Sequence, residues 1–184
     1  MNRHSARTTL VVGGARSGKS AFAQQLCEAS PYNLVYVATS PVFADDGEMS
    51  ARIQKHKDDR GPRWRAVEEE IDITKVIKDN DHADSALLID CATLWLNNLL
   101  YHQLPLTDHI NGFLQALETS QAHIVIVSNE VGQGIVPSAP EVRAFRDHQG
   151  RLNQHLASTC ERVVEVRCGL PILLKPIQQP HICL

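Results

Sequence analysis

Short apolar runs alternate along the chain with longer segments in which apolar residues recur at helical spacing. The short runs are rich in β-branched residues, which is typical of strands buried in a sheet. We predict buried strands at 10–12, 34–38, 86–90 and 123–128, a short strand at 64–68, and two closing strands at 162–167 and 171–174, the last as a hairpin partner or edge. We predict helices at 21–28, 48–57, 71–77, 94–102, 108–121 and 141–159.

This alternation of strands and helices predicts an α/β fold with a mainly parallel sheet and helices on both of its faces. The 184 residues contain no internal repeat and no low-complexity linker, so we expect one domain over 1–184, with loose termini at 1–7 and 176–184. The pattern does not set the order of the strands. It therefore leaves kinase-like and RecA-like topologies both open.

Composition and charge narrow the class of protein. A hydrophobic content of 43% and a charged content of 21% are those of an ordinary globular protein. The net charge of −3 argues against a nucleic-acid partner. Five cysteines without C-x-x-C spacing fit a reducing compartment. The polar N-terminus does not look like a signal peptide, and no uncharged apolar run reaches the roughly 18 residues of a membrane span. We expect a cytoplasmic protein.

The first predicted strand leads directly into the glycine-rich loop Gly13-Gly-Ala-Arg-Ser-Gly-Lys-Ser20 and then into a helix. Strand, loop and helix in this order are the context of a phosphate-binding P-loop. Lys19 would reach the β- and γ-phosphates, and the Ser20 hydroxyl would bind Mg²⁺. A glycine-rich turn without a ligand is the alternative. We predict nucleotide binding by all residues of the loop: Gly13, Gly14, Ala15, Arg16, Ser17, Gly18, Lys19 and Ser20.

Asp90 ends the apolar run that begins at Ala86. This is the form of a Walker B strand, in which the acid holds Mg²⁺ or its water. Such a strand is common in proteins of other kinds, but together with a P-loop it indicates a magnesium ligand.

Two further strand ends carry polar residues. Thr39 and Ser40 follow the strand at 34–38, and Asn129 and Glu130 follow the strand at 123–128. Ligands bind at the carboxyl ends of strands in open α/β sheets, and loops there often carry function. For Thr39 and Ser40, an ordinary strand-to-loop transition without a ligand is an equally good interpretation. For Asn129 and Glu130, the alternative is a capping Asn and a solvated Glu.

The predicted helix at 48–57 carries a histidine on its apolar stripe. Met49, Ile53 and His56 fall at i, i+4 and i+7, and basic residues surround them. From spacing alone, a half-buried structural histidine is a more common interpretation than a catalyst. The basic residues on their own are typical of a solvated face.

Taken together, these motifs resemble the bifunctional adenosylcobinamide kinase/adenosylcobinamide-phosphate guanylyltransferase family of cobalamin synthesis. The resemblance covers about Thr8 to Lys175. The matching segments are the loop 13–20, Tyr36-Val-Ala-Thr-Ser40, Glu48-Met, Arg52-Ile-x-x-His56-Lys-x-x-Arg60-x-Pro62-x-Trp64-Arg-x-x-Glu68, Asn129-Glu-Val-Gly-x-Gly-Ile-Val-Pro137, Phe145-Arg-Asp and Gly150-Arg-Leu-Asn-Gln154.

The resemblance implies two reactions. ATP or GTP phosphorylates the aminopropanol hydroxyl of adenosylcobinamide. GTP then donates GMP to adenosylcobinamide-phosphate, giving adenosylcobinamide-GDP and pyrophosphate. The family uses a covalent guanylyl-histidine in the second step, and the matching residue is His56. A neutral imidazole is a competent nucleophile for this chemistry.

The resemblance also implies the remaining contacts and the assembly. Mg²⁺ would lie on Ser20 and Asp90, the fold would be RecA-like, and the chain would form a homotrimer. Some members carry a second histidine where this chain has Lys55, which puts only an accessory role in doubt. Residues 1–7 and the tail after Lys175 have no counterpart in the family pattern. Besides the P-loop, the GTP contacts would be Ala38, Thr39, Ser40, Lys57, Asp58, Asp59, Arg60, Glu68 and Asp90.

Two other functions also fit the residues. A single-function P-loop kinase acting on a small molecule would use the loop, Mg²⁺ and Asp90 and leave His56 as a core residue. A non-catalytic nucleotide switch or a RecA-like ATPase would bind nucleotide without a small-molecule acceptor.

Overall fold

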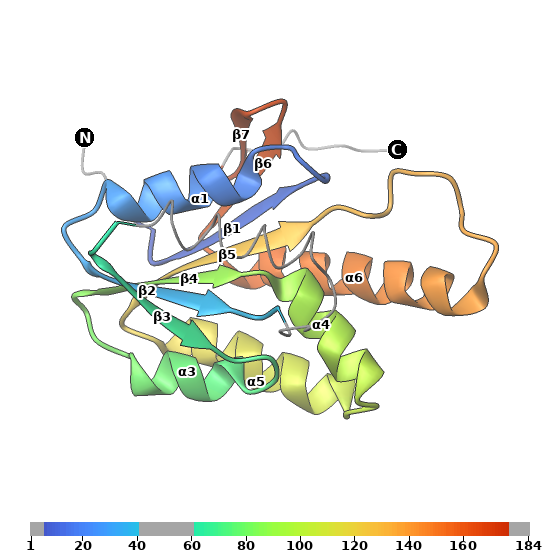
Figure 1. Ribbon diagram of the computed structural model, residues 1–184, viewed down its shortest axis with the longest axis horizontal. Helices are drawn as coiled ribbons and strands as arrows, with labels where there is room; N and C mark the ends of the chain where they lie inside the picture. The colour runs from blue at the N-terminus through green and yellow to red at the C-terminus, as the bar shows by residue number, and fades with distance from the viewer. Residues whose placement is uncertain (1–5, 41–60, 177–184) are drawn as a thin grey trace, which may run out of the picture.

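The computed structural model describes residues 6–40 and 61–176. Its strands form one seven-stranded sheet in the order β3-β2-β4-β5-β1-β6-β7 (Figure 1). β7 pairs antiparallel with β6, whereas the other strand pairs are parallel. The strands are β1 (Thr8–Gly13), β2 (Asn33–Ala38), β3 (Trp64–Glu68), β4 (Ser85–Asp90), β5 (His123–Asn129), β6 (Arg162–Arg167) and β7 (Leu170–Lys175).

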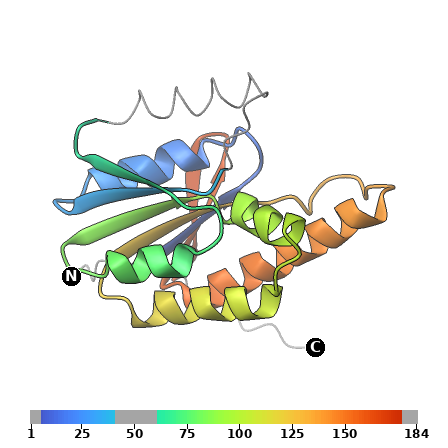
Figure 2. The same ribbon diagram turned by 60° about the horizontal axis from the view of Figure 1, so that its bottom comes forward.

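Helices cover both faces of the sheet (Figure 2). Of the described helices, α1 (Lys19–Glu28) packs on one face, and the opposite face carries α3 (Ile73–Asp79), α4 (Ala92–Tyr101), α5 (Leu106–Thr119) and α6 (Pro140–Thr159). Successive strand side chains point to opposite faces. Val11 and Val127 accordingly belong to the apolar cluster under α1, and Leu10 and Ile126 belong to the cluster under the other helices. The predicted fold, a mainly parallel sheet with helices on both faces, is confirmed.

Some predicted boundaries differ from the observed ones. The helix predicted at 108–121 is α5, and it starts directly after Pro105. Proline is best tolerated at a helix start, because its missing N–H loses no partner there. The helix predicted at 94–102 is α4, which begins at Ala92. The helix predicted at 48–57 lies outside the described residues.

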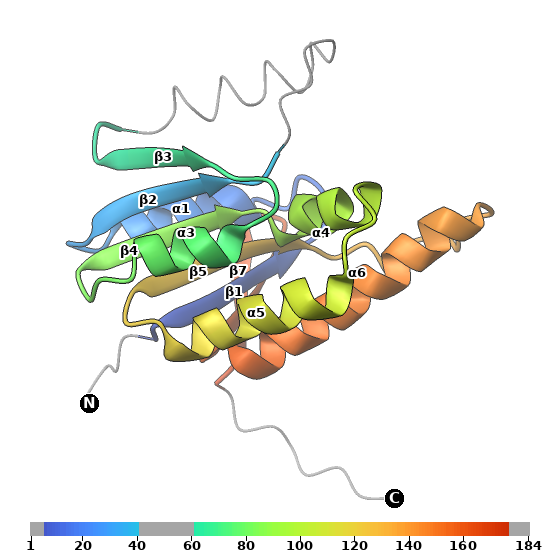
Figure 3. The same cartoon turned by 90° about the horizontal axis from the view of Figure 1, so that it is seen from below.

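The longest of the described helices, α6, extends its N-terminal half past the edge of the sheet (Figure 3). Its exposed residue Val142 follows a loop with exposed Ile135 and Val136. Within residues 6–40 and 61–176, no helix is long and apolar enough to cross a membrane.

Candidate nucleotide-binding site

Because the strands are parallel, their carboxyl ends lie at one edge of the sheet. Gly13 of β1 pairs with Asn129 of β5, and Ala38 of β2 pairs with both Asp90 of β4 and Glu68 of β3. The structure therefore brings the predicted residues of the P-loop, of β2, of β3 and of β4 to the same edge. This carboxyl edge is where open α/β sheets bind ligands.

The conformation of the loop between β1 and α1 depends on its glycines. Gly18 has a φ of +94°, in the left-handed region that favours glycine. A side chain at Gly13 would place its Cβ 2.5 Å from the Val166 carbonyl oxygen and 2.6 Å from Ser17 Oγ. Gly13 is therefore required by the close packing and Gly18 by its backbone conformation, whereas a Cβ at Gly14 would meet no atom within 4 Å.

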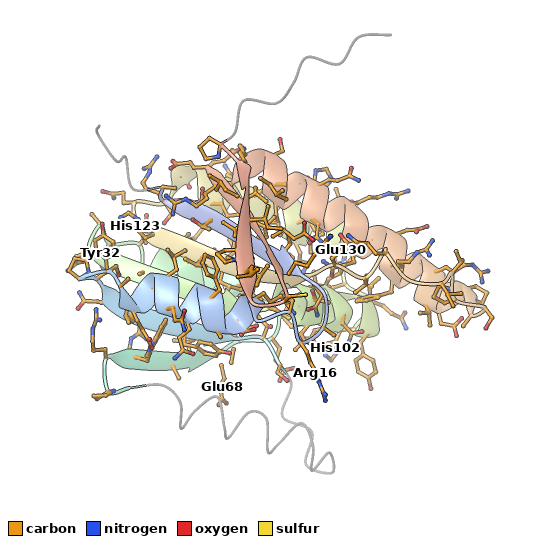
Figure 4. All side chains as sticks on the ribbon, turned by 90° about the horizontal axis from the view of Figure 1, so that it is seen from above. Arg16, Tyr32, Glu68, His102, His123 and Glu130 are labelled. Atoms are coloured by element: carbon orange, nitrogen blue, oxygen red, sulfur yellow. The ribbon has the colours of Figure 1, made fainter. Side chains whose placement is uncertain are left out.

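Lys19 occupies the position expected of a phosphate-binding cation. Its side chain is buried, and Nζ donates a hydrogen bond to the Gly14 carbonyl oxygen at 3.1 Å. Arg16 is exposed and points outward from the loop (Figure 4). A phosphate held by the loop N–H groups would therefore meet the Lys19 ammonium inside the loop.

The turn between β6 and β7 supports the loop from the side. The Gly169 N–H donates to the Ser17 carbonyl oxygen at 2.8 Å. A Cβ on Gly18 would lie 3.2 Å from the Gly169 Cα. Cys168 and Gly169 both have positive φ, +54° and +78°, which makes the turn tight. Sequence reasoning missed this contact, since nothing in the local pattern links the two segments.

Asp90 is half-buried at the end of β4, and its Oδ2 accepts a hydrogen bond from the Tyr36 hydroxyl at 3.3 Å. The neighbouring Cys91 is buried. Burial, with a smaller contribution from the Asp90 carboxylate, raises the pKa of the Cys91 thiol to about 11, while the Lys19 charge acts in the opposite direction. The thiol is therefore protonated at neutral pH and is no nucleophile.

Thr39 ties the end of β2 to the end of β4. Its buried hydroxyl donates to the Cys91 carbonyl oxygen and accepts from the Cys91 N–H, each at 2.8 Å. The Asn98 amide of α4 donates to the carbonyl oxygens of Thr39 at 2.8 Å and Glu70 at 3.1 Å. Thr39 thus has a structural function at this edge, and its contact with a ligand stays a prediction.

The oxygen donors of this edge fit magnesium. Within the described residues no group of three or more His, Cys, Asp or Glu side chains could hold a metal ion. Mg²⁺ bound to nucleotide phosphates needs only one or two protein oxygens, because phosphates and water supply the other ligands. The Ser20 hydroxyl at the start of α1 and the Asp90 carboxylate are oxygen donors of the required kind.

A buried polar network lies beneath the end of β5, and sequence reasoning missed it. Ser128 Oγ donates to Asn153 Oδ1 at 2.6 Å and accepts from Gln149 Nε2 at 2.9 Å. Asn153 Nδ2 donates to the Asn129 carbonyl oxygen at 3.0 Å, and the Asn129 N–H donates to Thr93 Oγ1 at 2.8 Å. The sequence did contain a signal: Gln149 is a polar residue on the apolar stripe of α6, between Phe145 and Leu152.

Five residues of the predicted site lie outside the described residues: His56, Lys57, Asp58, Asp59 and Arg60. Glu68 is exposed at the end of β3, beside Ala38.

Solved structures of RecA-like ATPases share this fold. The RadB recombinase aligns with a TM-score of 0.51 and 16% identity, covering 86% of this chain and 73% of its own. A prototypical ATPase from a bacterial type III secretion system aligns with a TM-score of 0.55 and 11% identity, covering 86% of this chain and 50% of its own. At these identities the likeness concerns the fold alone, and it confirms the RecA-like expectation.

Sequence relatives cover almost the whole chain. The bifunctional adenosylcobalamin biosynthesis protein CobP of Pseudomonas aeruginosa is 40% identical over 168 residues, covering 90% of this chain and 96% of its own. The bifunctional adenosylcobalamin biosynthesis protein CobU of Salmonella typhimurium is 38% identical over 181 residues, covering 90% and 98%. The family model described as cobinamide kinase / cobinamide phosphate guanyltransferase matches residues 9–174. The chain therefore belongs to the cobinamide kinase / cobinamide phosphate guanyltransferase family.

Proposed function

We propose that the protein phosphorylates the aminopropanol hydroxyl of adenosylcobinamide with ATP or GTP, and then transfers GMP from GTP to adenosylcobinamide-phosphate. Its family makes the chain a bifunctional transferase of cobalamin biosynthesis. The observation that supports the finer proposal is the placement of the buried Lys19 inside the loop, at the same edge of the sheet where β4 ends in Asp90. A cation and a carboxylate at one edge are what a shared phosphate and metal site requires.

In the kinase step, the loop N–H groups and Lys19 hold the triphosphate. Their positive charge stabilises negative charge that develops on the phosphate oxygens. The substrate hydroxyl oxygen attacks the γ-phosphorus and its proton passes to solvent. The bond from the γ-phosphorus to the bridging oxygen breaks, and the nucleoside diphosphate leaves. Mg²⁺, held by Ser20 and Asp90, would supply further charge neutralisation.

In the transfer step, an imidazole nitrogen of His56 attacks the α-phosphorus of GTP, and pyrophosphate leaves with its bridging oxygen. The phosphate oxygen of adenosylcobinamide-phosphate then attacks the same phosphorus, the P–N bond breaks, and His56 is restored. We propose that GTP is contacted in this step by Ala38, Thr39, Ser40, Lys57, Asp58, Asp59, Arg60, Glu68 and Asp90, in addition to the P-loop. A homotrimeric assembly and a cytoplasmic location belong to the same proposal.

The test is to incubate the protein with Mg²⁺ and GTP radiolabelled at the α-phosphate. We expect a protein-bound label that is acid-labile and base-stable, as a P–N bond is, together with released pyrophosphate. His56→Ala should abolish the label and guanylyl transfer but retain the phosphorylation of adenosylcobinamide. Lys19→Ala should sharply reduce both reactions, because each uses a bound triphosphate. His155→Ala, which changes an exposed histidine of α6, is the matched control and should label normally.

Other results would favour the other functions. Phosphate transfer to the corrinoid without any protein label would indicate the single-function kinase. Nucleotide binding with slow hydrolysis and no corrinoid acceptor would indicate the nucleotide switch. A label on Lys55 or Lys57, or one that survives His56→Ala, would contradict the histidine assignment.

A further inference from the structure

Asn129 lies between the two parts of the nucleotide site. It is the last residue of β5, the strand between β4, which ends in Asp90, and β1, which leads into the P-loop. It pairs with Gly13, and the next residue, Glu130, donates its N–H to the Gly13 carbonyl oxygen at 3.0 Å. The backbone of Asn129 is thus directly beside the start of the phosphate loop.

The side chain of Asn129 projects from the face of the sheet that carries the phosphate loop. Alternate residues of β5 point to opposite faces. Val125 and Val127 belong to the cluster under α1, so Asn129 follows them on that face, whereas Ser128 is on the other. Asp90 shares the face under α1, because its partner Tyr36 belongs to the same cluster. The amide of Asn129 is therefore on the same side as the phosphate loop and Asp90.

The backbone of Asn129 is fixed from the opposite face. Its N–H donates to Thr93 Oγ1, and its carbonyl oxygen accepts from Asn153 Nδ2. Asn153 in turn bonds to Ser128 and to the fully buried Gln149. The hydrogen bonds of this network fix one arrangement, because breaking one would leave a further buried polar atom unpaired, as Gln149 Oε1 already is. Helices α4 and α6 thus hold Asn129 in one place relative to the loop.

The amide itself has capacity to bind a ligand. Asn129 is half-buried, and its side chain makes no hydrogen bond to the residues that the structure describes. An Asn amide carries two N–H donors and no charge. It can therefore donate to a phosphate oxygen without the repulsion that a carboxylate would bring. A capping function, which was the alternative from the sequence, would need a bond from the Asn129 side-chain oxygen, and none is present among these residues.

We propose that Asn129 donates a hydrogen bond to the terminal phosphate of the bound nucleoside triphosphate, and that it thereby distinguishes triphosphate from diphosphate. The proposal rests on the nucleotide site of the proposed function. It adds a residue that reads the γ-phosphate, with Asn153 and Thr93 as positioning residues that hold its backbone.

The test compares binding of a non-hydrolysable GTP analogue and of GDP, each with Mg²⁺, by titration calorimetry. Asn129→Ala should weaken the analogue about tenfold or more, because a hydrogen bond to a charged group is lost, and should leave GDP nearly unchanged. Asn129→Asp keeps the shape but adds a negative charge, so it should lower the analogue's affinity further. Asn111→Ala, on the exposed side of α5, is the matched control and should leave both affinities unchanged.

An unchanged ratio of the two affinities in Asn129→Ala and Asn129→Asp would overturn the proposal. If the alanine variant does not fold, the near-isosteric aspartate variant alone decides. Failure of the proposed function looks different: wild-type protein would then bind neither nucleotide, or Lys19→Ala would bind both as well as wild type.

Discussion

Tyr36 is a residue whose effect on the site is indirect. It is buried under α1, and its hydroxyl donates to Asp90 Oδ2. Its ring also lies edge-on to Trp64, with centroids 6.2 Å apart. The ring is therefore fixed by packing, and the hydroxyl orients one oxygen of the Asp90 carboxylate, which we assign to Mg²⁺. Groups that orient a metal ligand commonly change metal affinity by 10–100-fold.

Tyr36→Phe should raise the Mg²⁺ concentration needed for half-maximal nucleotide turnover about tenfold, because the Asp90 carboxylate loses the donor that orients it. Nucleotide affinity measured without Mg²⁺ should change little. A titration of activity against Mg²⁺ measures the effect, with Tyr101→Phe on the exposed end of α4 as control. An equal Mg²⁺ requirement in wild type and Tyr36→Phe would mean that Asp90 does not depend on Tyr36.

At the scale of elements, the β6–β7 hairpin and the phosphate loop form one unit. Val166 limits the space at Gly13, and Gly169 contacts Gly18 and donates to Ser17. The loop is therefore clamped between its own strand and a hairpin from the end of the chain. Such support allows the loop to keep a conformation ready for phosphate before the ligand arrives, which reduces the cost of ordering it on binding.

Gly169→Ala should weaken nucleotide binding several-fold and lower the unfolding temperature. A Cβ at Gly169 meets open space, but its φ of +78° costs a side chain about 1–2 kcal/mol, so the turn would shift away from Ser17. Gly150→Ala in α6 is the control, since it also meets open space and should stabilise the helix by up to about 1 kcal/mol. Calorimetry and thermal unfolding measure both variants. Wild-type affinity in Gly169→Ala would show that the turn does not support the loop.

The elements differ in how far the sequence could predict them. The phosphate loop and the ends of β2 and β4 were predictable, because strand, loop and helix signals are local and the carboxyl ends of parallel strands must share an edge. Two contacts could not be predicted: the hydrogen bond from Gly169 to the phosphate loop, and the hydrogen bond from Asn153 to the Asn129 carbonyl oxygen. Each joins segments far apart in the chain, and which segments meet depends on the order of the strands, which periodicity does not encode.

At the scale of the whole molecule, exposed apolar side chains are concentrated on strand β7. β7 is an edge strand, and Leu170, Ile172, Leu173 and Leu174 on it are 69%, 44%, 42% and 40% exposed. An apolar edge strand left open to water is a site where chains associate, and proteins normally protect such edges. The exposed apolar side chains therefore support the proposed assembly of several copies, with β7 in the contact.

Replacing Leu170 and Ile172 together by Lys should dissociate the proposed homotrimer. The wild-type protein should show by light scattering about three times the chain mass of 20.4 kDa. The double variant should approach the mass of one chain, because two charged side chains would have to be buried without partners in the contact. Both side chains are exposed in one chain, so its cooperative thermal unfolding should persist.

Tyr101→Lys, which charges an exposed position on α4, should keep the wild-type mass. A wild-type mass near that of one chain at all working concentrations would contradict the trimer. A trimer that survives the double substitution would instead exclude β7 from its contacts.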